Sequence, residues 1–410
     1  MTILAALMDQ VTTGIAVLLF SILCIWRGTV AHRTGRQALP VIWLMVAGLA
    51  LRIFVAADPF LHEWDERFHA LVAKNMMEHP FRPTLYETPL LDYDYRSWLS
   101  NHIWLHKPPL PLWSISLSMK AFGVNEWALR IPSILLSTMG ILLTWSIGNG
   151  LYNRRVGFIA AFLFTIHGLI IELTGGRVTT DHYDVFFLFF ILASIWAALQ
   201  LIRQKKTVYQ LLCGIFLGMA LLSKWLPALI VLPVALLMMA GSGSFTRRET
   251  ALHLGGILLT ALAVTLPWHL HIHRMFPLEA AWESNYNFRH LTEAIEGHEG
   301  PFYYHFNNLR IIYGELVYLP VAWFLWKTVR KPVETRRLLL TTWFLVPFLF
   351  FSLVESKMQA YTLFTAPAIF IITGVFWHYL KVYRSRFRLK WVVNLILLLL
   401  LALPARYSLD

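Results

Sequence analysis

The sequence predicts an all-α polytopic membrane protein with about twelve transmembrane helices. Of its 410 residues, 57% are hydrophobic and only 14% are charged, whereas soluble domains carry about 25% charged residues. Cys24 and Cys213 both lie inside apolar runs, which favours core packing over a disulfide or a metal site. The runs of spanning or near-spanning length are residues 12–26, 40–57, 131–150, 156–173, 183–202, 208–222, 225–240, 251–270, 311–328, 338–354, 361–380 and 391–404.

The net charge of +12 predicts an orientation in the membrane and does not point to nucleic acid. More than half of the 35 Lys and Arg residues lie in six loops that contain almost no acids, apart from Glu249 and Glu334. These loops read "RGTVAHRTGR", "NRR", "RQKK", "TRR", "KTVRKPVETRR" and "KVYRSRFRLK". Because basic loops stay in the cytoplasm, we expect a multi-pass plasma (inner) membrane protein with its other loops outside.

Two of the outside loops are long, at about residues 58–130 and 271–310. Three shorter outside segments also carry ionisable groups: "GGRVTTDHYD" (175–184), "SKW" (223–225) and "ESKMQAY" (355–361). Polar groups from distant parts of the chain should therefore meet at one membrane face, on the extracytoplasmic side.

The first long loop is predicted to bear a surface helix, because "HEWDERFHALVAKNMMEH" has apolar residues at helical spacing. The residues at this spacing are Leu61, Trp64, Phe68, Leu71, Val72 and Asn75, all of them apolar except Asn75. Asp65 and Glu66 fall in the first turn, where a helix dipole favours carboxylates. Two interpretations stay open for this pair: complementation of the dipole, or chemistry.

The same loop continues with "LLDYDYRSW", in which Asp92 and Asp94 form an Asp-x-Asp pattern. Carboxylate oxygens at this spacing can bind a divalent cation. A three-residue pattern of this kind also arises often by chance. A divalent metal ion is therefore only one possible reading of it, and the sequence indicates no other cofactor.

"LHKPPLPLW" (105–113) interrupts a helical pattern with three prolines and places Lys107 between Trp104 and Trp113. Tryptophan marks the depth of the membrane interface, and a lysine can bind a phosphate as a point charge. A second outside lysine, Lys357, also precedes an apolar run. A single such lysine is explained equally well by snorkelling at a helix end. The set of cations beside carboxylates favours a site for a phosphate-linked lipid.

At these residues the chain resembles the multi-spanning glycosyltransferases that use a polyprenyl-phosphate sugar, the GT-C superfamily. It is similar to the bacterial relatives of the protein O-mannosyltransferases and of the lipid A aminoarabinose transferases. The resemblance covers roughly residues 50–375 and is strongest in "HKPPLPLWSISLSMKAFGVNEWALRIPSIL" (106–135). Further matches, in the family's order, are "WDER", "RVTTD", "SKW", "HEGPFYYH" and "SKMQAYTLFTAPA".

The resemblance implies a role for each matching residue. Asp65 would be the catalytic base, Glu66 would position it or bind the acceptor, and Asp181 would complete the acidic side of the cavity. The phosphate of the lipid donor would be neutralised by Lys107, Lys357, Arg289 and Tyr361. The chain departs from the family at His106, where relatives often carry an acid.

The predicted function is a glycosyltransferase that moves a sugar from a polyprenyl-phosphate donor to an extracytoplasmic acceptor, by inverting single displacement. The acceptor is a glycolipid, lipid A, a glycan or a protein; the bilayer is the other partner, and no nucleic acid is expected. We expect one transmembrane domain over residues 1–410, without a C-terminal soluble domain. The alternative is a secondary transporter with its substrate site at the outer membrane face.

Overall fold

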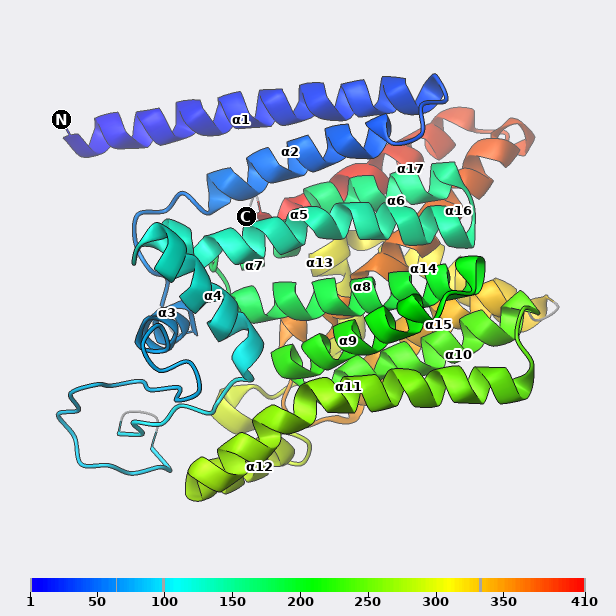
Figure 1. Cartoon of the computed structure of the whole chain (residues 1–410). Helices are drawn as coiled ribbons and strands as arrows, with labels where there is room; N and C mark the ends of the chain where they lie inside the picture. The colour runs from blue at the N-terminus through cyan, green and yellow to red at the C-terminus, as the bar shows by residue number, and fades with distance from the viewer. Residues whose placement is uncertain (1, 64, 98–99, 332–333, 409–410) are drawn as a thin grey trace.

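The computed structural model describes residues 2–63, 65–97, 100–331 and 334–408 (Figure 1). Throughout that part of the chain the regular elements are helices, with one isolated antiparallel bridge between Thr84 and Ile103. The α-helices are α1 (Thr2–Arg33), α2 (Leu39–Val55), α3 (Asp65–Asn75), α4 (Pro109–Phe122), α5 (Glu126–Leu151), α6 (Arg154–Ile166), α7 (Gly168–Thr174), α8 (Asp181–Gln204), α9 (Thr207–Lys224), α10 (Val231–Ser242), α11 (Arg247–Met275), α12 (Pro277–Arg289), α13 (Tyr304–Tyr313), α14 (Tyr318–Arg330), α15 (Thr335–Leu353), α16 (Ala366–Tyr383) and α17 (Lys390–Ala402).

Short 3-10 helices connect or extend several of these elements. They are η1 (Leu226–Ile230), η2 (Ile295–Gly297), η3 (Glu315–Val317), η4 (Gln359–Thr365), η5 (Arg384–Arg386) and η6 (Leu403–Ser408). Cys24 and Cys213 are free and buried, which confirms the prediction that they pack in the core.

The fold confirms the all-α membrane class. By length and composition, the described part of the chain has eight helices able to cross a membrane, or up to ten if each bent pair is one span. Leu39–Val55 and Leu226–Ser242 are apolar but shorter. The predicted number of about twelve is reached only if both bent pairs and both shorter helices cross the bilayer.

The centre of the bundle is α8, which packs against α5, α9 and α10. Its side chains are apolar on nearly all faces, and a helix of that kind is stable only when other helices surround it. Phe186 and Phe187 of α8 are each 1% exposed, and Phe187 meets Phe364 edge to face. Because α8 begins at Asp181, its rigid burial fixes the acidic groups at its N-terminus.

One membrane span is bent in the middle, and a buried arginine donates hydrogen bonds to the carbonyls at the bend. Helices α6 and α7 meet at His167 with a bend of 51°. Carbonyls released by such a break need donors inside the protein. Arg52 of α2 supplies them: it donates to the carbonyls of Thr165 (3.2 Å) and Phe164 (3.3 Å) and to the hydroxyl of Ser137 (2.6 Å). This contact explains a charge within the second apolar run.

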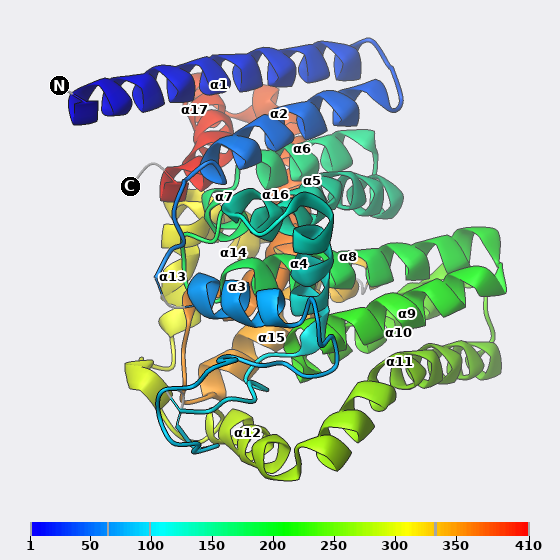
Figure 2. The ribbon, with the colours of Figure 1, turned by 60° about the vertical axis from the view of Figure 1, so that its left-hand side comes forward.

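The first long loop, predicted at 58–130, contains two helices joined by a long stretch whose described residues are not helical. It forms α3 and α4, which pack together through a small apolar cluster that includes Val72, Leu112 and Ile115. The predicted surface helix is confirmed as the helix α3, but its apolar face packs against α4. Trp64, one of the predicted apolar positions, lies outside the described residues. Figures 1 and 2 place α3, α4 and α12 at one end of the bundle, while the α1–α2, α8–α9 and α10–α11 connections lie at the other.

Two interpretations of "LHKPPLPLW" are wrong. The prolines do not stop a helix: α4 begins there, with Pro109 at its first turn, where the missing N–H costs nothing. Trp104 is 2% exposed and packs edge to face on His69, so it is a core side chain and not an interface anchor. Residue Lys107 lies on the non-helical segment that enters α4.

Candidate active site

Asp65 is the first residue of α3 and is half-buried. Its Oδ2 accepts a hydrogen bond from the backbone N–H of Thr180 at 2.7 Å. That N–H is presented by a strained turn, because Thr180 (φ 67°) and Asp181 (φ 32°) both have positive φ without being glycine. The turn before α8 is therefore shaped to hold the carboxylate of Asp65.

The carboxyl group of Asp65 is ionised at any physiological pH. Burial by itself would raise its pKa, but Lys107, His69, the Thr180 N–H and His106 together lower the pKa to about 2. Since this folded value lies below the ordinary 3.8, the group stabilises the fold above pH 3.8. That contribution is lost as the pH falls toward 2.

Lys107 is the cation that faces Asp65. Its half-buried ammonium interacts electrostatically with Asp65, with Asp184 and with a second lysine, Lys224. Among the described residues it makes no hydrogen bond or close ion pair. Two lysines near one another raise the local positive potential, and this arrangement attracts an anion.

Lys224 and Asp184 are site residues that sequence reasoning did not single out. Lys224 ends α9, and its Nζ lies 2.5 Å from Oδ1 of Asp184. The other carboxylate oxygen of Asp184, Oδ2, accepts a hydrogen bond from the Thr180 hydroxyl. The Lys224 ammonium also lies 5.3 Å from the ring centroid of Tyr361. Two features of the sequence indicate these residues. The motif "SKW" places a lysine at a helix end, and Asp184 lies on the same helix face as Asp181.

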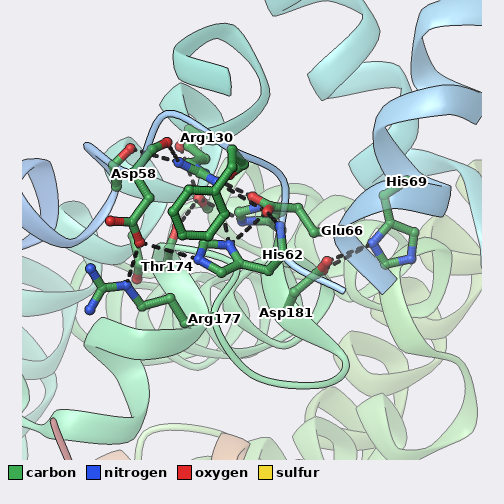
Figure 3. Close-up of polar contacts among 12 residues, drawn as sticks. Asp58, His62, Glu66, His69, Arg130, Thr174, Arg177 and Asp181 are labelled. Atoms are coloured by element: carbon green, nitrogen blue, oxygen red, sulfur yellow. Dashed lines mark hydrogen bonds and ion pairs between the residues drawn. The ribbon is translucent and has the colours of Figure 1, made fainter. Parts of the chain in front are cut away.

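Glu66 lies on the other side of α3 and is fully buried in an ion-pair network (Figure 3). Its Oε1 is 2.7 Å from Nε of Arg130, and its Oε2 accepts from the backbone N–H of His62 at 2.6 Å. Burial would raise the pKa of Glu66, but hydrogen bonds from His182, His62 and Arg130 hold it well below its ordinary value. Arg130 also donates to the carbonyls of Asp58 and Phe60, so the pair ties the start of the first loop to α5.

Breaking this pair should destabilise the protein. Glu66→Gln leaves the buried Arg130 guanidinium without its counter-charge, which typically costs about 3–5 kcal/mol. The apparent unfolding temperature in detergent should therefore fall sharply. Glu63→Gln, an exposed acid on the same segment, should leave it unchanged. A stable Glu66→Gln protein without turnover would instead make Glu66 a residue of the chemistry.

Asp181 is buried and binds His69, as Figure 3 shows. Its two carboxylate oxygens lie 3.0 and 2.9 Å from Nδ1 of His69. His69 lies one helical turn after Asp65 and interacts with it electrostatically. Asp181 thus reaches the site through a histidine that the sequence did not single out.

Two predicted phosphate ligands are engaged elsewhere. Lys357 is 5% exposed, and its ammonium donates to the Val354 carbonyl at 2.6 Å. Arg289 is partly exposed and pairs with Glu293 one turn further along the chain at 2.6 Å. Tyr361 is also a predicted phosphate ligand and comes from outside the first loop. The structure brings it close to Lys224, Asp184 and Asp65.

Asp92 and Asp94 lie together on an exposed stretch of the first loop. Oδ1 of Asp94 accepts from the backbone N–H of Arg96 at 2.9 Å, as in a local Asx turn. Within the described ranges, no group of three or more His, Cys, Asp or Glu side chains is arranged to hold a metal ion. A metal at this pair stays a prediction.

Solved membrane glycosyltransferases have this fold. ArnT from Cupriavidus metallidurans, bound to undecaprenyl phosphate, matches with a TM-score of 0.64 and 19% identity over 82% of this chain and 60% of that one. The archaeal oligosaccharyltransferase AglB from Archaeoglobus fulgidus, in complex with an inhibitory peptide and a dolichol-phosphate, matches with a TM-score of 0.58 and 14% identity. That match covers 90% of this chain and 55% of AglB. By fold, the chain is a GT-C type membrane protein.

Sequence comparison agrees and confirms the predicted resemblance. Residues 106–271 match the family described as dolichyl-phosphate-mannose-protein mannosyltransferase. The undecaprenyl phosphate-alpha-4-amino-4-deoxy-L-arabinose arabinosyl transferase of Pseudomonas aeruginosa (strain UCBPP-PA14) is 28% identical over 289 residues, which is 64% of this chain and 49% of that protein. A second such transferase, from Proteus mirabilis, is 25% identical over 285 residues, 65% of this chain and 49% of its own length. The chain spans about half the length of the curated relatives it matches. The transporter alternative is not supported.

Proposed function

We propose that the chain is a glycosyltransferase that moves a sugar from a polyprenyl-phosphate donor to an extracytoplasmic acceptor by inverting single displacement. One observation carries the proposal: the ionised carboxylate of Asp65 lies beside two lysines, Lys107 and Lys224, at one end of a membrane bundle. The relatives are named as transferases that use undecaprenyl phosphate sugars, which supports the donor class.

In the proposed reaction, Asp65 takes the proton of an acceptor hydroxyl or amine, and the acceptor atom attacks the anomeric carbon. The bond from that carbon to the phosphate oxygen breaks, and polyprenyl phosphate leaves with the electron pair. A positioned base typically contributes about 10²–10⁴-fold. A phosphate leaves without being protonated, so one carboxylate suffices, unlike the two that glycoside hydrolysis requires.

The leaving phosphate is assigned to Lys107, Lys224 and Tyr361. Lys107 brings an ammonium that no close internal anion neutralises among the described residues, and Lys224 adds a second positive charge held by Asp184. Preorganised cations of this kind stabilise the negative charge that develops on the leaving group. Arg289 and Lys357 would reach the phosphate only after leaving Glu293 and the Val354 carbonyl.

Donor binding should also strengthen the base. In the free protein, Lys107 helps to hold the pKa of Asp65 at about 2, which leaves the carboxylate ionised but weakly basic. A phosphate bound at Lys107 brings negative charge beside Asp65 and raises its pKa. Asp65 would thus become an effective base only when the donor is in place. Asp181 would position His69 and Glu66 would position α3, so both are assigned supporting roles.

The proposed site faces the extracytoplasmic side. The basic loops lie at the end of the bundle opposite α3 and α12, and the positive-inside rule places those loops in the cytoplasm. A membrane-impermeant thiol reagent applied to intact cells should therefore label Asp92→Cys and spare Lys206→Cys. Background labelling should be low because both native cysteines are buried. Labelling of the second variant and not the first would invert the orientation.

The function is tested by mass spectrometry of envelope glycolipids and glycoproteins from cells with the chain, without it, and with Asp65→Asn. We expect a mass increment of one sugar residue on an envelope molecule that appears only with the intact chain. The increment identifies both sugar and acceptor. Identical spectra in all three strains, with the protein present in the membrane, would contradict the proposal.

A further inference from the structure

The end of the bundle opposite the proposed active site contains an open cavity of about 330 Å³. It lies between the last turns of α14 and α16, the end of α5 and the start of α15. Helix α5 carries Arg130, in the ion-pair network, near its start and ends beside Tyr152, which lines this cavity. At 1.5 Å per residue, Arg130 and Tyr152 are roughly 33 Å apart along the helix, so the cavity belongs to the other membrane face.

The cavity already holds its own cation. The ammonium of Lys327 lies 4.7 Å from the ring centroid of Trp323 and 4.4 Å from that of Tyr379. Aromatic faces of this kind would otherwise bind a quaternary ammonium ligand. Because Lys327 occupies them, a choline headgroup has no cation site here, and the ligand must carry the opposite charge.

The rest of the lining fits an anion with an apolar body. Arg337 adds a second permanent positive charge, and the lining acid, Glu334, is half exposed and 3.5 Å away from it. The phenol oxygen of Tyr152 is buried without a hydrogen-bond partner among the described residues. A buried polar atom of this kind costs free energy unless something bonds to it. The valines of α16, Val375 and Val382, add apolar surface.

We propose that this cavity binds an anionic phospholipid of the cytoplasmic leaflet, with the phosphate at Lys327, Arg337 and the Tyr152 hydroxyl and the acyl chains along the α16 valines. Basic pockets between transmembrane helices on this side of a membrane are suited to such headgroups. The lipid bridges α5, α14, α15 and α16 and stabilises their packing. The proposal does not depend on the chemistry at Asp65, which lies at the other membrane face.

The test is a thermal-unfolding titration of the purified full chain in detergent with three probes: short-chain phosphatidylglycerol, short-chain phosphatidylcholine and inorganic phosphate. We expect a saturable rise of the unfolding temperature with phosphatidylglycerol alone. A cation near the membrane surface contributes about 1 kcal/mol to anionic-lipid binding, so Lys327→Gln and Arg337→Gln should each weaken the apparent affinity about fivefold. Tyr152→Phe should weaken it roughly two- to tenfold.

The matched control is Lys381→Gln. Lys381 lies in the last turn of α16 and, like Lys327, stacks on a tryptophan, Trp377 at 4.7 Å, but it does not line the cavity. It should leave the affinity unchanged. An equal loss in this control, equal stabilisation by phosphatidylcholine, or equal stabilisation by inorganic phosphate would each overturn the proposal. If Lys327→Gln does not fold, Tyr152→Phe carries the test, because it removes a single hydroxyl and keeps the ring.

Discussion

Replacing Asp65 with asparagine lowers turnover at least about 100-fold and does not weaken donor binding, because the bound phosphate no longer lies beside the Asp65 charge. Asparagine keeps the size of the side chain and can still accept the Thr180 N–H bond, but it cannot take a proton from the acceptor. The loss of a positioned base accounts for the size of the effect. Steady-state kinetics with a polyprenyl-phosphate sugar, together with a donor-binding measurement, separate the two quantities.

The control for this experiment is Glu63→Gln, an exposed acid two residues earlier on the same segment. It removes the same charge from the same loop and should keep turnover near the wild-type value. Normal turnover in Asp65→Asn would move the base to another carboxylate. Asp184 would be the next candidate, since it lies in the same electrostatic cluster.

Replacing Lys107 with alanine damages both donor binding and turnover. The ammonium acts on the phosphate in the bound donor and, more strongly, in the transition state, so KM rises and kcat falls together. Removing one preorganised group at a developing charge typically costs about 10²–10³-fold. Lys107 makes no close ion pair within the described ranges, so this variant breaks no direct contact, but it removes a cation that stabilises the Asp65 carboxylate.

Two further measurements on Lys107 distinguish phosphate binding from snorkelling. Lys107→Arg should recover part of the activity, because the charge remains while its geometry changes. In Lys107→Ala the pKa of Asp65 should rise, since a cation that lowers it is gone. The acid limb of kcat/KM should therefore move to higher pH. Lys120→Ala, an exposed lysine in the last turn of α4, should behave as wild type. Normal turnover in Lys107→Ala would show a snorkelling lysine.

Sequence patterns predicted the apolar helices and the gathering of ionisable groups at one face, because both follow from the bilayer. They could not reveal how the broken span is satisfied. Arg52 donates hydrogen bonds to carbonyls more than a hundred positions away, at a bend that no sequence pattern in α6 predicts. From sequence alone, the prolines at the start of α4 predict a helix stop as readily as a helix start, and only the packing of the neighbouring elements decides which.

The sequence singles out Asp65 as an acid in the first turn of a helix and Lys107 as a cation at a proline-rich break, both in a long outside loop. The motif "SKW" contains Lys224, but the sequence assigns this lysine no role. Its partner Asp184 lies on a different helix, and their 2.5 Å contact depends on how α8 and α9 pack. Glu66 was grouped with Asp65 as a neighbour in sequence. On a helix, adjacent residues point in different directions, and Glu66 turns inward to Arg130.

The central claim is that Asp65, with Lys107 and Lys224, transfers a sugar from a lipid phosphate. Its most direct measurement is the release of polyprenyl phosphate, followed by liquid chromatography and mass spectrometry. Purified protein is incubated with a membrane lipid extract that contains polyprenyl-phosphate sugars and the envelope acceptors. We predict steady release by the wild-type protein, with one sugar gained by an acceptor for each polyprenyl phosphate, and at least about 100-fold slower release by Asp65→Asn. Equal rates for the two proteins, or no release by the wild-type protein while donor remains in the extract, would contradict the account.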